Sequence, residues 1–181
     1  MAESTHRLGR RVPLRKAQVD DARLLAQLGA RLFEQTFASA NDPDDMRAYL
    51  TGAFSIDCQT AELEDGSRVT WIAEDAGQAA VGYATLRRGT CSEGVVAVAP
   101  AEVQRIYVDH AWHGREVGQA LIDACVGQAR AWHCDVVWLA VWERNARAIA
   151  FYKKMGFAPV GSQTFMLGRD EQQDVVMARP A

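Results

Sequence analysis

The chain has 181 residues, of which 49% are apolar and 24% are charged, a composition typical of a globular protein with one ordinary core. Twenty lysines and arginines against 23 aspartates and glutamates give a net charge of −3, which argues against a nucleic acid as the main partner. No apolar run approaches the roughly 18 residues that a membrane-spanning helix needs, so we expect no membrane association. The four cysteines show no CxxC spacing, and we therefore expect free thiols, no metal site and a cytoplasmic location.

The first third of the chain is predicted to contain a strand and two helices. Residues 12–17 alternate between polar and apolar side chains, as a strand does. A helix is expected next, from leucines that recur at helical spacing: Leu24, Leu28 and Leu32. The stretch NDPDDMRAYL, residues 41–50, opens a second helix, with Asn41 or Asp42 as its cap and a proline in the first turn.

The remainder is predicted to be a β-hairpin followed by alternating strands and helices. The expected strands are residues 69–75, 79–88, 101–109, 135–141, 157–167 and 173–178, with a loop over 89–100. One helix is expected after Gly114, and another over 145–155 that ends at Gly156. The strand DVVWLAV is apolar without alternation, as in a central strand covered on both faces. This order predicts an α/β fold with a mixed sheet and helices on both faces, rather than a regular doubly wound repeat.

Residues 110–121, HAWHGREVGQAL, join a predicted strand to a predicted helix through a short loop. The first amides of a helix have no intrahelical partner and the helix dipole adds positive charge there, so such a junction can hold phosphates. Neither GxxxxGK[ST] nor GxGxxG is present. Taken alone, Gly114 and Gly118 fit a phosphate-binding loop and fit equally well a turn glycine followed by a helix glycine that packs on a strand.

Two blocks taken together resemble the acetyl-CoA-binding core of the GNAT family of N-acetyltransferases. The first, VQRIYVDHAWHGREVGQALI, carries the family pattern Q/R-x-x-G-x-G/A on residues 113–118. The second, WLAVWERNARAIAFYKKMGF, matches N-x-x-A-x-x-F-Y-x-x-x-G-F from Asn145 to Phe157. The general likeness extends over residues 12–178. The segments TFMLGRDEQQDVVMARP and NDPDDMRAYL further resemble the PaiA-type branch, which acetylates spermidine and spermine.

The resemblance implies one acetyltransferase domain over residues 12–181, preceded by a flexible tail over residues 1–11. It implies a mostly antiparallel central sheet that is splayed at the cofactor site. It also implies acetyl-CoA as cosubstrate and a primary amine as acceptor, with a polyamine such as spermidine or spermine as the narrower candidate. The implied acetyl-CoA-binding residues are Ile106, Tyr107, Val108, His113, Gly114, Arg115, Glu116, Val117, Gly118, Gln119, Asn145, Tyr152 and Lys154.

Two positions of the loop depart from the family pattern, His113 in place of Gln or Arg and Glu116 in place of Gly. In the family, the backbone amides of this loop, residues 113–118, form a cradle for the pyrophosphate. A side chain therefore matters there only through its conformation and its charge. We expect Glu116 to adopt ordinary right-handed helical geometry. Its repulsion of a pyrophosphate about 8 Å away through solvent is only about 0.5 kcal/mol, and we expect the cradle to work.

Acetyl transfer to an amine requires a proton acceptor. A lysine-like amine has a pKa of about 10.4, so only about one molecule in 2,500 is neutral at pH 7. Glu102, on the strand that runs to the acetyl site, is the first candidate for the base and Glu34 the second, with a solvated surface acid as the alternative for each. Tyr152 is the candidate acid for the leaving thiolate, or else a core aromatic. Asn145 binds the pantetheine, caps its helix, or does both.

Several side chains on the acceptor side have a structural and a functional interpretation. The acidic group Asp42, Asp44 and Asp45 either attracts a polycation or only starts a helix. Phe33 and Phe37 form an i,i+4 pair, and for them, as for Tyr49, core packing is the expected role. Two other functions stay open: acetylation of a protein or peptide amine, and CoA binding without turnover. The oligomeric state also stays open, a homodimer included.

Overall fold

The protein is described by a computed structural model over residues 12–181, so the tail predicted for residues 1–11 lies outside the described residues. The strands are β1 (Leu14–Lys16), β2 (Arg68–Glu74), β3 (Ala80–Arg88), β4 (Pro100–Val108), β5 (Val136–Trp142), β6 (Ala158–Leu167) and β7 (Asp170–Pro180). The α-helices are α1 (Ala22–Phe37), α2 (Pro43–Ala53), α3 (Ile56–Glu64), α4 (Val117–Ala131) and α5 (Ala146–Lys154). Three short 3₁₀ turns are η1 (Val19–Asp21), η2 (Ala38–Ala40) and η3 (His110–Trp112).

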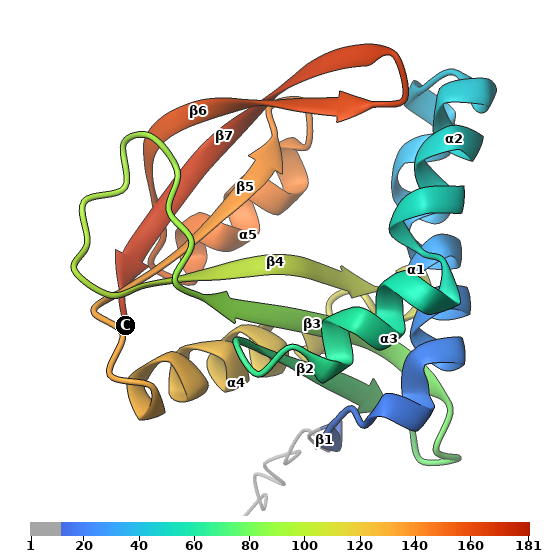
Figure 1. The fold of residues 1–181 in the computed structure, drawn as a ribbon, viewed down its shortest axis with the longest axis horizontal. Helices are drawn as coiled ribbons and strands as arrows, with labels where there is room; N and C mark the ends of the chain where they lie inside the picture. Colours follow the sequence, from blue (N-terminus) through green and yellow to red (C-terminus); the bar gives the residue numbers. More distant parts are fainter. Residues whose placement is uncertain (1–11) are drawn as a thin grey trace, which may run out of the picture.

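The seven strands form one sheet in the order β1-β2-β3-β4-β5-β7-β6 (Figure 1). All neighbours are antiparallel except β4 and β5, which run parallel. These two strands pair only where Pro100–Glu102 faces Val136–Trp138; within residues 12–181 they form no further pairs and diverge toward their C-terminal ends. The predicted mixed, mostly antiparallel and splayed sheet is therefore confirmed.

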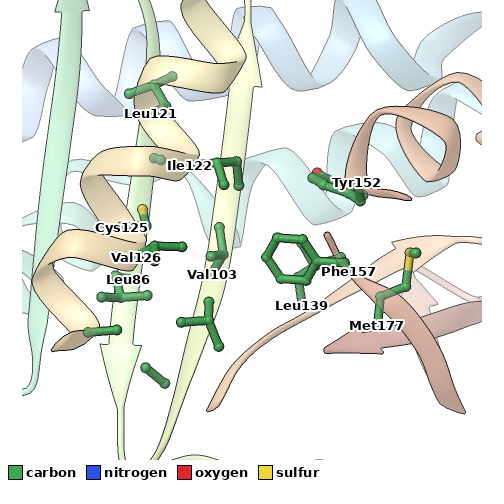
Figure 2. Packing of buried hydrophobic residues seen from close by; sticks show 14 of the residues in the cluster. Leu86, Val103, Leu121, Ile122, Cys125, Val126, Leu139, Tyr152, Phe157 and Met177 are labelled. Carbon is green, nitrogen blue, oxygen red and sulfur yellow. The ribbon is translucent and has the colours of Figure 1, made fainter. Parts of the chain in front are cut away.

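Helices cover both faces of the sheet. Figure 2 shows Leu121, Ile122 and Cys125 of α4 packed toward Leu86 and Val103 of the strands. On the same face α5 contributes Tyr152 to this main core cluster. The opposite face carries α1, whose buried leucines pack against two residues of β2 and β3: Leu25, Leu28, Leu32, Ile72 and Tyr83. The sheet is thus the middle of three layers, as its central apolar strands require.

A bulge in β4 changes which face its side chains reach. The register with β3 shifts so that Leu86 pairs with Val103 and Thr85 pairs with Arg105, leaving Gln104 as the extra residue. Before the bulge, Val103 packs in the α4 core. After it, Tyr107 packs against α1 and α2. The C-terminal half of β4, which borders the splay, is therefore aimed differently from its N-terminal half.

The local predictions agree with the structure in most elements. Asp42 caps α2 by accepting from the Asp44 and Asp45 amides, and Pro43 is its first residue. Gly156 ends α5 with φ +86°. The helix α3 was not predicted, because it lacks an apolar stripe: Ile56 is exposed and its one buried residue is Gln59. None of the helices within residues 12–181 has both the length and the apolar character needed to cross a bilayer.

Candidate functional site

A cavity of about 650 Å³ opens where β4 and β5 separate. One side is lined by the η3–α4 loop, the start of α4 and the face of α5 that carries Asn145 and Tyr152. The other side is lined by α1, α2 and the ends of β5, β6 and β7. Because these two groups of elements cover opposite faces, the cavity passes through the sheet. A molecule bound on one face can therefore meet a molecule bound on the other.

The loop before α4 turns through two left-handed residues. Gly114 has φ +74°, and Glu116 has φ 62° and ψ 5°. The prediction of right-handed geometry at Glu116 is therefore wrong. The chain must turn from the extended conformation of His113 into α4 within three residues, and this alternation of backbone handedness turns successive amides toward one side. Only glycine adopts this conformation without strain, which gives a physical reason for the family preference at residue 116.

The first turn of α4 has free amides. Glu116 is the N-cap residue but its side chain makes no capping hydrogen bond, and the first intrahelical bond runs from Ala120 N to Glu116 O at 2.9 Å. The amides of Val117, Gly118 and Gln119 are therefore left without an intrahelical partner, and all three residues line the cavity. A Cβ on Gly118 would lie 3.2 Å from Cζ of Phe151, so α4 and α5 approach closely here. These features fit a pyrophosphate at the helix N-terminus.

His113 braces the cradle as a neutral imidazole. Its Nε2 donates to the Val108 carbonyl at 3.0 Å, and its Nδ1 accepts from Nη1 of Arg147 at 2.5 Å. Burial, followed by the nearby Arg147 charge, lowers the pKa of His113 below its ordinary value. The bond holds the Arg147 guanidinium beside the loop, where it can offset the Glu116 charge. Sequence reasoning missed Arg147; the available signal was a basic residue in the first turn of the helix that faces the cradle.

Asn145 and Tyr152 both face the cavity from α5, as their sequence spacing predicted. Asn145 is the N-cap residue, and its Oδ1 accepts from the Ala148 amide at 3.2 Å, which leaves its Nδ2 group as a donor. Tyr152 is 8% exposed, and burial raises the pKa of its hydroxyl above the ordinary value. Tyr152 is therefore protonated at neutral pH and can donate a hydrogen bond.

The structure places some of the predicted site residues in the cavity lining and others outside it. Ile106, Tyr107 and Val108 line the cavity, on the edge of β4 that faces the splay. Arg115 does not line it; its guanidinium lies over the Trp112 ring at 5.1 Å, so this residue contributes through the backbone of the loop.

Lys154 and Glu34 also lie away from the cavity. Lys154 is exposed in the last turn of α5 and is not part of the cavity lining. Glu34 is exposed on α1 and points away, because Phe33 and Phe37 occupy the helix face that lines the cavity. This geometry leaves Glu34 without access to a bound amine.

Glu102, the first candidate base, lies at the closed end of the splay, where it forms the last β4–β5 pair with Trp138. It lines the cavity, but its Oε2 accepts from Nη2 of Arg87 at 2.6 Å and from the hydroxyl of Thr90 at 2.9 Å. These bonds hold the carboxylate beside the guanidinium.

The α1–α2 side of the cavity is mostly aromatic. Phe33 lies 4.5 Å from Phe37 and 4.8 Å from Tyr49, measured between ring centroids, so the predicted packing role is confirmed although all three residues also line the cavity. Sequence reasoning missed the strand residues that complete this wall: Trp142, Gln163, Phe165, Gln172 and Asp174. Asp174 is 9% exposed, and burial raises its pKa to about 6. The available signal was one acid inside an otherwise uncharged strand segment, QQDVVMA.

The acidic group at the start of α2 has structural partners. Asp42 caps the helix, Asp44 pairs with Arg47 at 2.7 Å, and Asp45 accepts from the Arg169 amide at 2.9 Å. The last bond ties α2 to the β6–β7 turn above the cavity. These contacts support the helix-start interpretation of the group.

Comparison with known proteins is consistent with this geometry. A model of the acetyltransferase (GNAT) family matches residues 30–157. An uncharacterised N-acetyltransferase of Mycobacterium tuberculosis is 32% identical over 159 residues, which are 88% of this chain and 97% of that protein. One of Lactobacillus delbrueckii subsp. lactis is 29% identical over 147 residues, 81% of this chain and 84% of that protein. Among solved structures, the PaiA N-acetyltransferase of Thermoplasma acidophilum, in complex with coenzyme A, superposes with a TM-score of 0.75 at 16% identity, covering 94% of this chain and 99% of that one.

Proposed function

The chain belongs to the GNAT family of N-acetyltransferases, whose members use acetyl-CoA, and on this premise we propose that it acetylates a small primary amine. The observation that carries the proposal is the cavity through the sheet. Its α4–α5 side offers free amides for a pyrophosphate, and its α1–α2 side offers aromatic walls and a buried acid. The two sides meet at the gap between β4 and β5, where an amine and a thioester can come together.

The residues on the α4–α5 side fit acetyl-CoA by their chemistry. The amides of Val117, Gly118 and Gln119 would hold the pyrophosphate, with the Arg147 guanidinium beside them. The Nδ2 group of Asn145 would donate to the pantetheine. Amides of β4 between Ile106 and Val108 would bind the thioester carbonyl and stabilise the negative charge that develops on its oxygen.

Tyr152 is the proposed donor to the leaving sulfur. The bond that forms joins the amine nitrogen to the acetyl carbon, and the bond that breaks joins that carbon to sulfur. A reference thiol has a pKa of about 8.5, far below that of the buried Tyr152, so full proton transfer from Tyr152 to the thiolate is uphill. Tyr152 therefore acts by hydrogen bonding to the sulfur as charge builds on it. The assignment of Glu102 as the base stays a prediction.

A polyamine is the narrower acceptor that we propose, because a second cavity adjoins the first. This cavity of about 180 Å³ shares Trp142 and Gln172 with the main one, and its lining carries three acids and one cation: Glu143, Asp170, Glu171 and Arg144. An amine that reacts in the main cavity could place a second cationic group near these acids. The likeness to the PaiA structure, at 16% identity, supports only the fold.

The test is a thiol-release assay with acetyl-CoA and a panel of amines. The informative pair is hexylamine and 1,6-diaminohexane, which have the same chain length and differ by one charge. We expect the diamine and spermidine to give the higher kcat/KM. Equal rates for the pair would contradict the polyamine proposal while leaving amine acetylation intact. Preference for a peptide amine would favour the protein-acetylating alternative, and CoA binding without thiol release from any amine would favour a binding module.

A further inference from the structure

Asp174 stands at the centre of the acceptor wall. In the sheet it is the cross-strand partner of Trp142 on β5 and of Gln163 on β6, and all three residues line the cavity. Alternation along β5 and β7 puts Val141 and Met177 in the α4–α5 core, so Trp142 and Asp174 project from the opposite face. The carboxylate is therefore on the α1–α2 side, which is the proposed acceptor side.

Among the residues that the structure describes, the Asp174 carboxylate has no protein partner. Within residues 12–181 it receives no hydrogen bond and forms no ion pair, although it is 9% exposed. Glu102, the other acid lining the acceptor side, is held by Arg87. A largely buried carboxylate that no protein group pairs with is costly in free energy, and a cationic ligand in the cavity would supply the missing charge.

Among the described residues, 12–181, no neighbouring cation pairs with Asp174. Arg105 of β4 lines the cavity but pairs with Glu62 of α3. Tyr49 of α2 is protonated, because burial raises its pKa. The lining residues of α1 and β6 carry no charge: Phe33, Thr36, Phe37, Gln163, Phe165 and Leu167. Beyond the end of β5, Arg144 is exposed and lies over the Trp142 ring at 5.9 Å.

We propose that Asp174 binds the ammonium group of the acceptor and then accepts its proton, as the general base of the acetyl transfer. This inference rests on the proposed function. The ammonium gives one proton to the carboxylate and becomes a neutral amine, which forms the bond to the acetyl carbon. As the carbon–sulfur bond breaks, the second proton on nitrogen passes to the thiolate, and Asp174 later releases its proton to water. The aromatic rings around it, Trp142 and Tyr49, add cation–π attraction for the ammonium.

Burial gives Asp174 two properties that a base needs. Its pKa of about 6 keeps it ionised at pH 7, and it also holds a proton more tightly than an exposed aspartate does. Glu102 lacks this freedom, because its carboxylate is bonded to Arg87 and Thr90. The geometry therefore favours Asp174 over Glu102 as the proton acceptor.

The central experiment compares Asp174→Asn with the wild type, using the best amine of the panel. The substitution keeps the shape and removes the charge, so we expect kcat/KM for the amine to fall by about 10²–10⁴-fold. The KM for acetyl-CoA and the thermal shift that acetyl-CoA causes should not change. Wild-type kcat/KM should rise with pH through an acidic limb near pH 6, and this limb should be absent in the variant. Asp174→Glu should restore part of the activity and the limb.

A second acceptor separates proton transfer from simple structural damage. The nitrogen of hydroxylamine is mostly unprotonated at pH 7, so its acetylation has little need of a base, and Asp174→Asn should lose much less activity toward it. Asp123→Asn, the same change on the exposed face of α4, is the matched control and should behave as wild type.

Three results would overturn the proposal. One is Asp174→Asn activity within threefold of wild type. Another is an equal loss toward hydroxylamine and the basic amine. The third is a loss of the acidic limb in Glu102→Gln but not in Asp174→Asn. The proposed function itself fails in a different way, when wild-type protein releases no thiol with any amine.

Discussion

At the scale of single residues, Glu116 shows how a cradle made of backbone groups can tolerate an unfavourable side chain. Its φ of 62° lies in the region that non-glycine residues enter at a cost of about 1–2 kcal/mol. The surrounding turn imposes this geometry, because Gly114 before it and α4 after it fix the chain direction. The side chain itself is exposed and forms no cap. The effect of its charge and the effect of its backbone conformation can therefore be tested by different substitutions.

Glu116→Gly should stabilise the free protein by roughly 0.5–1 kcal/mol. Relief of the left-handed strain exceeds the entropy that glycine adds to the unfolded chain, about 0.4–1 kcal/mol. Glu116→Gln keeps the strain and should not gain this stability. Both variants remove the charge and should bind CoA up to about threefold more tightly at low salt. Urea unfolding and calorimetric titration measure the two effects, and a tenfold loss of CoA affinity in either variant would make Glu116 a positive part of the site.

Tyr152→Phe should lower kcat by roughly 10–150-fold, the value of a hydrogen bond to a charged group, about 1.5–3 kcal/mol. The KM for acetyl-CoA should change little, because the lost hydroxyl acts on the sulfur only as charge builds there. Steady-state kinetics with the best amine provides the measurement. A higher KM with an unchanged kcat would instead assign Tyr152 to binding.

Asp174→Asn should be more stable than wild type at pH 7 although it is less active. In the folded protein the Asp174 pKa is about 6, above the ordinary value of 3.8, so between pH 4 and pH 6 the folded state binds more protons than the unfolded state. The free energy of unfolding therefore falls as pH rises through this window. The variant lacks this fall and should gain on the order of 1–2 kcal/mol at pH 7, after allowance for partial hydration of the carboxylate.

Urea unfolding of both proteins at pH 4 and pH 7 tests this expectation. The difference between them should be small at pH 4 and should appear by pH 7. A variant that is less stable than wild type at both values would show that Asp174 has a structural partner.

At the scale of elements, α5 joins a structural and a binding role at one residue. Asn145 caps the helix through Oδ1, while Nδ2 of the same amide remains available at the cavity. The cap fixes the direction of a helix of only nine residues, and that direction decides where Tyr152 points. The two alternatives raised from sequence, capping and pantetheine binding, are therefore compatible.

Asn145→Ala should lose about 0.5–2 kcal/mol of stability through the lost cap. Asn145→Ser keeps a capping oxygen and should be nearly as stable as wild type. If Nδ2 binds the pantetheine, the serine variant should still lose CoA affinity. Melting temperature and CoA affinity, measured on both variants, separate the roles. Full CoA affinity in the serine variant would show that Asn145 only caps α5 and does not bind the pantetheine.

At the scale of the whole molecule, the site is a gap in a sheet whose two parts are held together elsewhere. Three residue pairs join β4 to β5 at one end. Across the gap, α2 reaches the β6–β7 turn through the bond from the Arg169 amide to Asp45. Acetyl-CoA bound by α4, β4 and α5 would connect elements on both sides of the opening. The predictions of a cytoplasmic location, of a homodimer and of one domain over residues 12–181 stay predictions at this scale.

Acetyl-CoA at about 100 times its Kd should stabilise the fold by about 2.7 kcal/mol. For a chain of this size that corresponds to a rise in melting temperature of roughly 5–10 °C. Differential scanning fluorimetry measures it. Acetyl-pantetheine, which lacks the nucleotide and its pyrophosphate, should give a much smaller rise. The absence of any shift at millimolar acetyl-CoA would contradict binding at the loop before α4.

Local signals in the sequence predicted most of the elements, whereas the cofactor-binding residues were assigned from the resemblance to the GNAT family. Capping residues, the glycine at 156 and the spacing between Asn145 and Tyr152 act within one or two helical turns, so they can be read without the fold. The helix α3 was not predicted from the sequence, because its burial depends on polar and charged contacts rather than on an apolar stripe. One of these contacts is the ion pair of Glu62 with Arg105.

The tertiary structure alone decided the acceptor side. Asp174 becomes a buried carboxylate, unpaired among residues 12–181, only because β7 lies between β5 and β6 and because α1 and α2 close over it. Glu102 is engaged by Arg87, a partner 15 residues away on the adjacent strand, and the left-handed geometry of Glu116 follows from the direction in which α4 must leave the sheet. The first two of these properties depend on groups distant in sequence, and the third depends on how the loop joins β4 to α4. Burial and charge pairing are set by such groups, and they decide which carboxylate is free to meet an amine.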